Sequence, residues 1–276
     1  MFASVELARR IDAAEAHMMA AMVELARGRG TPDVEASELG GGIASYVRAG
    51  APMNKVIGLG FDGPIDEAAL VAVEQRWRKR AEPLQVELAT LARCETAEQF
   101  TARGYQLRAF ENVLGADPNA AAAGPPTAHQ VERADDRDVE AWIDCIADAF
   151  LQPDGTGAGT MDAFPRAEMI AALQQTMAVP GMRRYSVRVG GTLAGGASMR
   201  IDPEGVALLC GAATLPAFRR RGVQSALLQA RLREASAAGC DIAVITTQPG
   251  SKSQQNAQSR GFALLYARAI LVQPPA

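Results

Sequence analysis

The sequence predicts an α/β protein made of two tandem copies of one domain, each with a central mixed, mostly antiparallel sheet flanked by helices. Its 276 residues correspond to just under two domains of ordinary size. Helical and strand periodicities of apolar residues alternate in both halves. The halves also align without a gap from about residue 53 to 114 when one is shifted by 157 positions. At that offset the matched residues include Phe61 with Phe218, Leu70 with Leu227, Arg76 with Arg233, Thr90 with Thr247, and Arg103-Gly104-Tyr105 with Arg260-Gly261-Phe262.

The composition excludes several classes of protein. A net charge of −3 lacks the basic excess of a dedicated nucleic-acid binder. With 48% hydrophobic and 21% charged residues the chain can bury a core, so general disorder is not expected. No run of 18 apolar residues and no signal-like N-terminus is present, so we expect a cytoplasmic protein without a membrane partner.

The cysteines and histidines argue against a metal centre and a disulfide framework. No two of the four cysteines form a C-x-x-C pair, and the only histidines are His17 and His129. A zinc site or a Ser-His-Asp triad would have to use those two histidines. We therefore expect no metal, reduced thiols, and a solvated His129. The cysteines are Cys94, Cys145, Cys210 and Cys240.

A Pro/Ala-rich stretch divides the chain. Proline pairs cannot continue a helix or a central strand, so residues 116–130 are predicted to be a semi-rigid linker. The expected domains are therefore 1–115 and 131–276, each of plausible size.

From about residue 53, the expected elements of the first half follow in the same order as those of the second half. In the first half we predict helices at 5–27, 66–81 and 96–103 and strands at 42–48, 55–59, 84–92 and 105–114. In the second half we predict helices at 139–150, 166–177, 224–238 and 253–260, a Gly/Thr loop at 155–159, and strands at 185–189, 192–199, 206–214, 242–247 and 262–272.

The segment 214–228 contains the most informative chemistry. It runs from a strand end through three consecutive arginines and Gly222 into a helix. A helix N-terminus presents unpaired N–H groups and a partial positive charge, which suits a phosphate or pyrophosphate. Neither a Walker A loop nor a G-x-G-x-x-G loop is present. The alternative is a solvated basic turn that caps the helix.

The same segment resembles motif A of the GNAT N-acetyltransferase superfamily, [R/Q]-x-x-G-x-[G/A]. Arg219, Gly222 and Gln224 occupy the defined positions, and Gln224 departs from the usual Gly or Ala. The resemblance extends over roughly residues 131–272 through the order of elements. It implies two tandem GNAT-like domains, of which 131–276 binds acetyl-CoA.

The resemblance also implies which residues hold acetyl-CoA. The backbone of Ala213, Thr214 and Leu215 would hold the pantetheine and thioester. Arg219 and the loop and helix amides would hold the pyrophosphate, and Ser253 and Asn256 would contact the cofactor or cap their helix. The amides in question belong to Arg220, Arg221, Gly222, Val223, Gln224, Ser225 and Ala226.

The implied reaction is direct acetyl transfer to a small amine or amino-acid-like acceptor. The general acid and base are harder to place. Many family members carry a Glu on the strand before motif A, but residues 206–212 hold no carboxylate. Ala257 stands where many carry a Tyr. Tyr266 is the nearest replacement acid, with a half-buried strand tyrosine as the alternative. Cys210 suggests an acetyl-enzyme, but a buried structural thiol without a cationic neighbour is the preferred interpretation.

The first half is expected to have lost the cofactor site. At the 157-residue offset, the loop 219–222 corresponds to Asp62-Gly63-Pro64-Ile65. Pro64 removes a donor, and Asp66 and Glu67 place carboxylates where a pyrophosphate would lie. We therefore predict an acetyltransferase with one degenerate domain, as a monomer or homodimer. The competing hypothesis is a non-catalytic acyl-CoA-binding or regulatory protein that kept only the loop.

Overall fold

The computed structural model describes residues 2–124, 127–153, 155 and 165–275. The chain forms two compact units, one of residues 113–264 and one of residues 2–112 with 265–276. We call them the C-terminal unit and the N-terminal unit. Each contains a mixed sheet flanked by helices, as the predicted fold class requires.

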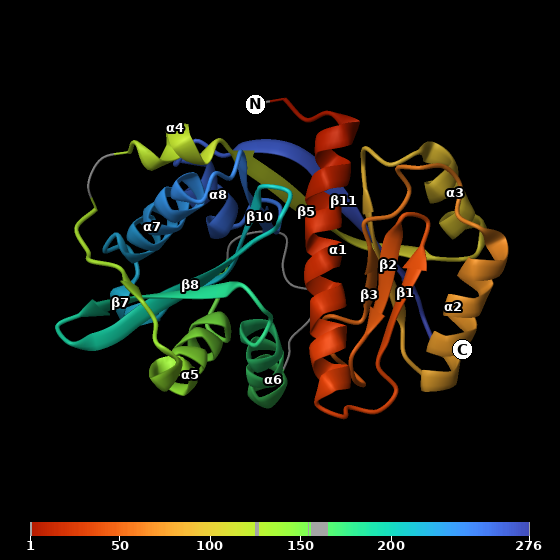
Figure 1. Cartoon of the computed structure of the whole chain (residues 1–276), viewed down its shortest axis with the longest axis horizontal. Coiled ribbons are helices and arrows are strands. Elements are labelled where there is room, and N and C mark those ends of the chain that lie inside the picture. The colour runs from red at the N-terminus through yellow and green to blue at the C-terminus, as the bar shows by residue number, and fades with distance from the viewer. Residues whose placement is uncertain (1, 125–126, 154, 156–164, 276) are drawn as a thin grey trace. The chain divides into compact units, whose positions relative to one another are not determined.

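In the C-terminal unit the strands lie in the order β5-β10-β9-β8-β7-β6. Only β9 and β10 run parallel among the register pairs described for this unit. Helix α7 packs on one face of the sheet around Leu227 and Leu232, and α5 and α6 cover the other face around Trp142 and Ile146 (Figure 1). The elements are α4 (Pro118–Ala122), β6 (Glu132–Arg133), α5 (Val139–Phe150), α6 (Arg166–Met177), β7 (Met182–Val189), β8 (Thr192–Ile201), β9 (Val206–Thr214), α7 (Val223–Ala237), β10 (Ile242–Thr247) and α8 (Lys252–Gln258), with β5 (Gln106–Ala116) and β11 (Ala263–Gln273) shared between the units.

In the N-terminal unit the order is β1-β2-β3-β4-β11, with β5 beyond β11. Strands β3 and β4 are parallel, matching β9 and β10. Helices α2 and α3 cover one face around Trp77 and Phe100, and α1 lies on the other face (Figure 1). The elements are α1 (Val5–Gly28), β1 (Glu35–Leu39), β2 (Gly42–Tyr46), β3 (Lys55–Ile57), α2 (Glu67–Arg80), β4 (Leu84–Ala89) and α3 (Cys94–Ala102).

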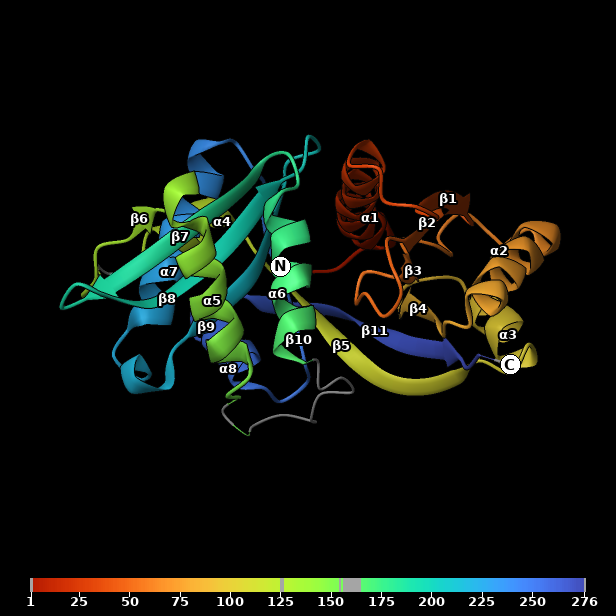
Figure 2. The same ribbon diagram turned by 90° about the horizontal axis from the view of Figure 1, so that it is seen from below.

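Two strands cross between the units, which the predicted boundaries did not include. Strand β5 passes from the N-terminal to the C-terminal unit at Val113, and β11 passes back after Leu264. The strands lie side by side over much of their length (Figure 2). Residues 265–276 therefore belong to the N-terminal unit rather than to a domain 131–276. The reason is a backbone pairing of β11 with β4, which local sequence patterns do not reveal.

The repeat predicted from the sequence is present in the elements. An offset of 157 carries β5 (Gln106–Ala116) onto β11 (Ala263–Gln273), and α2 onto α7 within one residue. The predicted linker differs from expectation because it contains helix α4, begun by Pro118 and capped by Asp117, whose side chain accepts from Asn119 N. The predicted loop 155–159 lies outside the described residues apart from Gly155.

Candidate acetyl-CoA site

Among the residues that the structure describes, no side chain caps the backbone donors at the N-terminus of α7. Gly222 is its N-cap, with φ 84°, and makes no side-chain cap hydrogen bond. The first helical bond runs from Ala226 N to Gly222 O at 3.0 Å, so the amides before Ala226 lie outside the helical ladder. Together with the helix dipole they form a site that favours an anion.

The loop before α7 is a tight turn with two left-handed residues. Arg220 has φ 60° and Gly222 has φ 84°. A Cβ at Gly222 would meet only His129 Cδ2, at 3.9 Å, so the space beside this glycine is open. Gly222 is therefore required for its backbone angle, and the opening leaves room for a ligand.

Strands β9 and β10 diverge just before this loop. Their register pairs run only from Val206–Ile242 to Leu208–Val244, although β9 continues to Thr214 and β10 to Thr247. The β8–β9 register shifts between Gly196 and Ser198, which marks a β-bulge in the same part of β9. The edge of β9 that faces β10 is thus free of β10 beyond Leu208. An extended ligand can pair with that edge.

The predicted residues Arg219, Thr214 and Gln224 form one hydrogen-bonded group. Arg219 Nε donates to Thr214 O at 3.1 Å, and its Nη2 donates to Ala149 O at 3.2 Å and to Gln152 O. Gln224 Nε2 donates to Thr214 Oγ1 at 2.9 Å. The side chain of Arg219 therefore fastens the strand end to the end of α5, and the Gln224 amide turns back onto the strand.

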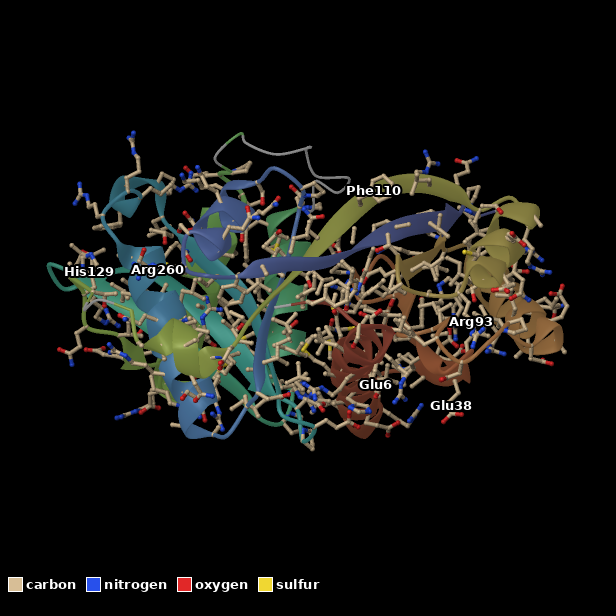
Figure 3. All side chains as sticks on the ribbon, turned by 90° about the horizontal axis from the view of Figure 1, so that it is seen from above. Glu6, Glu38, Arg93, Phe110, His129 and Arg260 are labelled. Atoms are coloured by element: carbon tan, nitrogen blue, oxygen red, sulfur yellow. The ribbon has the colours of Figure 1, made fainter. Side chains whose placement is uncertain are left out.

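His129 is not simply solvated, which corrects the sequence-based expectation. Its Nε2 lies 2.6 Å from Arg221 O, so the ring donates to the arginine loop from the segment that precedes β6 (Figure 3). A carbonyl oxygen only accepts, so Nε2 carries the proton. This contact joins residues far apart in sequence, and no local pattern predicts it.

Tyr266 lies in the N-terminal unit, and its hydroxyl is hydrogen-bonded within that unit. The hydroxyl donates to Asp12 Oδ1 at 2.5 Å, and the residue is 5% exposed. Burial and the neighbouring Asp12 charge raise the pKa of Tyr266 far above its usual range. The side chain is thus a packed strand tyrosine, more deeply buried than the half-buried alternative given above, and its role as general acid stays a prediction.

Cys210 has a cationic neighbour that the sequence did not indicate. Arg231 of α7 is 2% exposed, and its Nη1 donates to Ser198 O at 3.1 Å and to Cys210 O at 3.5 Å. Burial lowers the pKa of Arg231 to about 10, against the opposing effect of the Cys210 thiol. The thiol itself lies 3.3 Å from Ser198 Oγ. Arg231 thus hydrogen-bonds backbone carbonyl oxygens of β8 and β9 beside the bulge. Glycines at the register shift, Gly211 on β9 and Gly195 and Gly196 on β8, are local signals of this irregularity.

The remaining predicted residues lie on α8. Ser253 is exposed and Asn256 is half-buried. The cap of this helix is Ser251, whose side chain accepts from Gln254 N, so the alternative capping role for Ser253 is wrong. Ala257 is buried in the core beneath the helix, and no acid or base stands in its place.

The equivalent loop of the N-terminal unit is closed by its own side chains. Asp66 caps α2 by accepting from Ala69 N at 2.8 Å, and Gln99 bonds both the amide and the carbonyl of Ile65, each at 2.9 Å. Backbone amides that have no described side-chain acceptor at the start of α7 have one at two of the equivalent positions around the start of α2. This difference supports the expected loss of a cofactor site in the first half.

Comparisons with solved structures find chains of similar fold. The chain resembles a GCN5-related N-acetyltransferase from Kribbella flavida at 16% identity, with TM-score 0.62 over 92% of this chain and 96% of that one. A tandem GNAT protein from the clavulanic acid biosynthesis pathway matches at 12% identity, TM-score 0.60, over 92% and 88%. A functionally unknown protein from Staphylococcus epidermidis matches at 11% identity, TM-score 0.56, over 76% and 79%.

These identities establish the fold alone. Among curated proteins none matches the sequence. No helix in the described part of the chain is long and apolar enough to cross a membrane. Residues 142–262, which include the divergent strands and the uncapped helix, match the model of the acetyltransferase (GNAT) family. This match lies within the C-terminal unit, so the resemblance to the GNAT family concerns that part of the chain.

Proposed function

We propose that the chain is an acetyl-CoA-dependent N-acetyltransferase that acts on a small amine or amino-acid-like acceptor, with its cofactor site in the C-terminal unit. The observation that carries the proposal is the combination of an uncapped α7 N-terminus with the divergence of β9 from β10. The start of α7 offers backbone N–H donors for a pyrophosphate. The end of β9, where β10 no longer pairs with it, offers a strand edge for an extended pantetheine.

The residues present fit acetyl-CoA. The amides from Arg220 to Ser225 surround a left-handed turn with open space beside Gly222, whereas the predicted Ala226 amide is already bonded to Gly222 O. Ala213 to Leu215 follow the bulge at the end of β9. Thr214 is held by the side chains of Arg219 and Gln224, which fixes this strand end before a ligand binds. Ser253 and Asn256 on the neighbouring helix are proposed to contact the nucleotide portion.

Acetyl-CoA, when bound, supplies the acetyl group as a thioester, and acceptor attack forms the C–N bond as the C–S bond breaks. The task of this chain is to hold the thioester carbonyl against backbone donors and to remove water from it. The carboxylate-free strand 206–212 supplies no base. We therefore propose that the acceptor amine loses its proton to water or to a group on the acceptor side.

The first experiment is calorimetric titration of the full chain with acetyl-CoA. We expect one site, and we expect Gly222→Glu to abolish it because the new carboxylate would face the pyrophosphate. Gly239→Glu is a matched control, since Gly239 follows the other end of α7 with φ 78° and has open space within 4 Å of the position that a Cβ would take. Normal binding by Gly222→Glu, or equal loss in both variants, would refute the assigned loop.

The competing hypothesis is an acyl-CoA-binding regulator without turnover. Two observations favour it: the absence of a carboxylate on β9, and a buried Ala257 in the usual tyrosine position. Release of free CoA thiol in the presence of a panel of small amines separates the two. Tight binding without release from any amine would favour the regulator.

A further inference from the structure

The N-terminal unit holds a buried cluster of charges where β11 joins it. Arg268 of β11 is 0% exposed and lies between two carboxylates of α1. Its Nη2 is 2.6 Å from Asp12 Oδ1, and its Nη1 is 2.7 Å from Glu15 Oε2 and 3.6 Å from Glu87 Oε2. Lys55 of β3 completes the cluster, with Nζ 2.7 Å from Glu87 Oε1.

This cluster contains more carboxylates than cations. Asp12 Oδ2 and Glu87 Oε2 are buried and accept no hydrogen bond from the described residues. Although burial works to raise it, the charges of Arg268 and Lys55 hold the pKa of Glu15 at about 2. Removal of either cation would leave carboxylates buried without compensation, which is strongly unfavourable. The acidic members are Asp12, Glu15, Glu87 and Glu111, and the basic members are Lys55 and Arg268.

The two strands that cross between the units carry opposite charges where they meet this cluster. At the 157-residue offset, Leu271 of β11 corresponds to Leu114 of β5, and each is buried in the core of the unit that it enters. This apolar position is therefore shared by the two strands. Arg268, however, corresponds to Glu111, so the charge is inverted. Tyr266, which donates to Asp12, corresponds to an alanine.

We propose that this charge cluster is a recognition site for one extended segment, the C-terminal strand with its Tyr266-Ala267-Arg268 sequence. The N-terminal unit accepts β11 beside β4 and rejects the equivalent strand β5 of a second copy of the chain. A β5 segment of a second copy placed there would bring a second Glu111 beside Asp12, Glu15, Glu87 and the chain's own Glu111, with only Lys55 to balance them. The cluster thereby keeps the strand pairing within one chain and opposes a strand-swapped dimer.

The test measures how firmly β11 is held in full-length variants. We expect Arg268→Glu to accelerate amide hydrogen exchange over residues 266–272 by about 100-fold or more. Arg76→Glu is the control, because it reverses an arginine of the same unit that pairs with Glu35 at 38% exposure and lies outside the cluster. Protection of 266–272 in Arg268→Glu equal to that of wild type would overturn the proposal.

Synthetic peptides then test the selection between strands. The Arg268→Glu chain, with its own strand displaced, should bind a labelled peptide of residues 263–275 and not one of residues 106–116. The second peptide should gain binding when it carries Glu111→Arg. Equal binding of both natural peptides would show that the charges select nothing.

A conservative series covers the case in which Arg268→Glu does not fold. Arg268→Lys keeps the charge and Arg268→Met removes it while filling similar space. If charge holds the strand, exchange over 266–272 should be at least about tenfold slower in the Lys variant than in the Met variant. Equal rates would refute recognition by charge.

Discussion

Tyr266→Phe separates a structural role from a catalytic one. The change removes only the hydroxyl that donates to Asp12 Oδ1 at 2.5 Å in the buried cluster. A hydrogen bond to a charged group contributes about 1.5–3 kcal/mol, and Asp12 would keep Arg268 as its remaining partner. For a unit of about 120 residues, each kcal/mol corresponds to roughly 4 °C, so we expect the unfolding midpoint to fall by about 6–12 °C.

The assay is differential scanning calorimetry together with acetyl transfer measured well below the transition. We expect kcat to change less than about twofold, because the hydroxyl is buried against a carboxylate in the N-terminal unit. Tyr105→Phe is the control, since its hydroxyl donates to Glu74 at 3.3 Å in the same unit outside the cluster. It should shift the midpoint less. A large loss of kcat with an unchanged midpoint would refute the structural role and restore Tyr266 as the acid.

Two further predictions concern single side chains. Burial, followed by the charge of Glu87, raises the pKa of Glu111 to about 7, above its usual value of 4.5. A raised carboxyl pKa favours the folded state at low pH, so this contribution is complete below about pH 4.5 and is lost as pH rises through 7. Glu111→Gln should therefore flatten the dependence of unfolding midpoint on pH between 4.5 and 7.5, and an unchanged slope would contradict the assignment. Gln224→Ala removes the 2.9 Å bond to Thr214 Oγ1. We expect a loss of about 0.5–1.5 kcal/mol in stability and less than a threefold change in the acetyl-CoA dissociation constant, because the loop binds through its backbone; a tenfold weakening in calorimetry would show that the side chain holds the cofactor.

The sequence predicted those parts of the fold and site that depend on neighbouring residues. The helix at 139–150 and the strands at 206–214 and 242–247 coincide with α5, β9 and β10. The arginine-rich turn into α7 was recognisable because strand, turn and helix follow one another along the chain. Strand β1 was not predicted because its sequence, EASEL, lacks the β-branched and aromatic residues typical of strands.

The rest depended on contacts between distant residues. The bond from Tyr266 to Asp12 spans 254 positions, and that from His129 to Arg221 spans 92. No local pattern encodes such pairings, so Tyr266 was predicted as an acid and His129 as solvated. The crossing of β5 and β11 has the same cause. The opposite charges of Arg268 and Glu111 can be read from the sequence. Only the pairing of β11 with β4 shows that Arg268 meets buried carboxylates.

The two units begin the equivalent helix with different N-cap residues. Helices α2 and α7 begin within one residue of each other at the repeat offset, and each follows a parallel strand. On α2 the cap is Asp66, whose carboxylate accepts the Ala69 amide and presents a negative charge. On α7 the cap is Gly222, which has no side chain to occupy the donors or repel a phosphate. A glycine N-cap costs only a few tenths of a kcal/mol relative to a polar cap, so α7 leaves its first amides open at little cost to folding. We therefore expect the cofactor at α7 and not at α2, whose cap uses one of the amides.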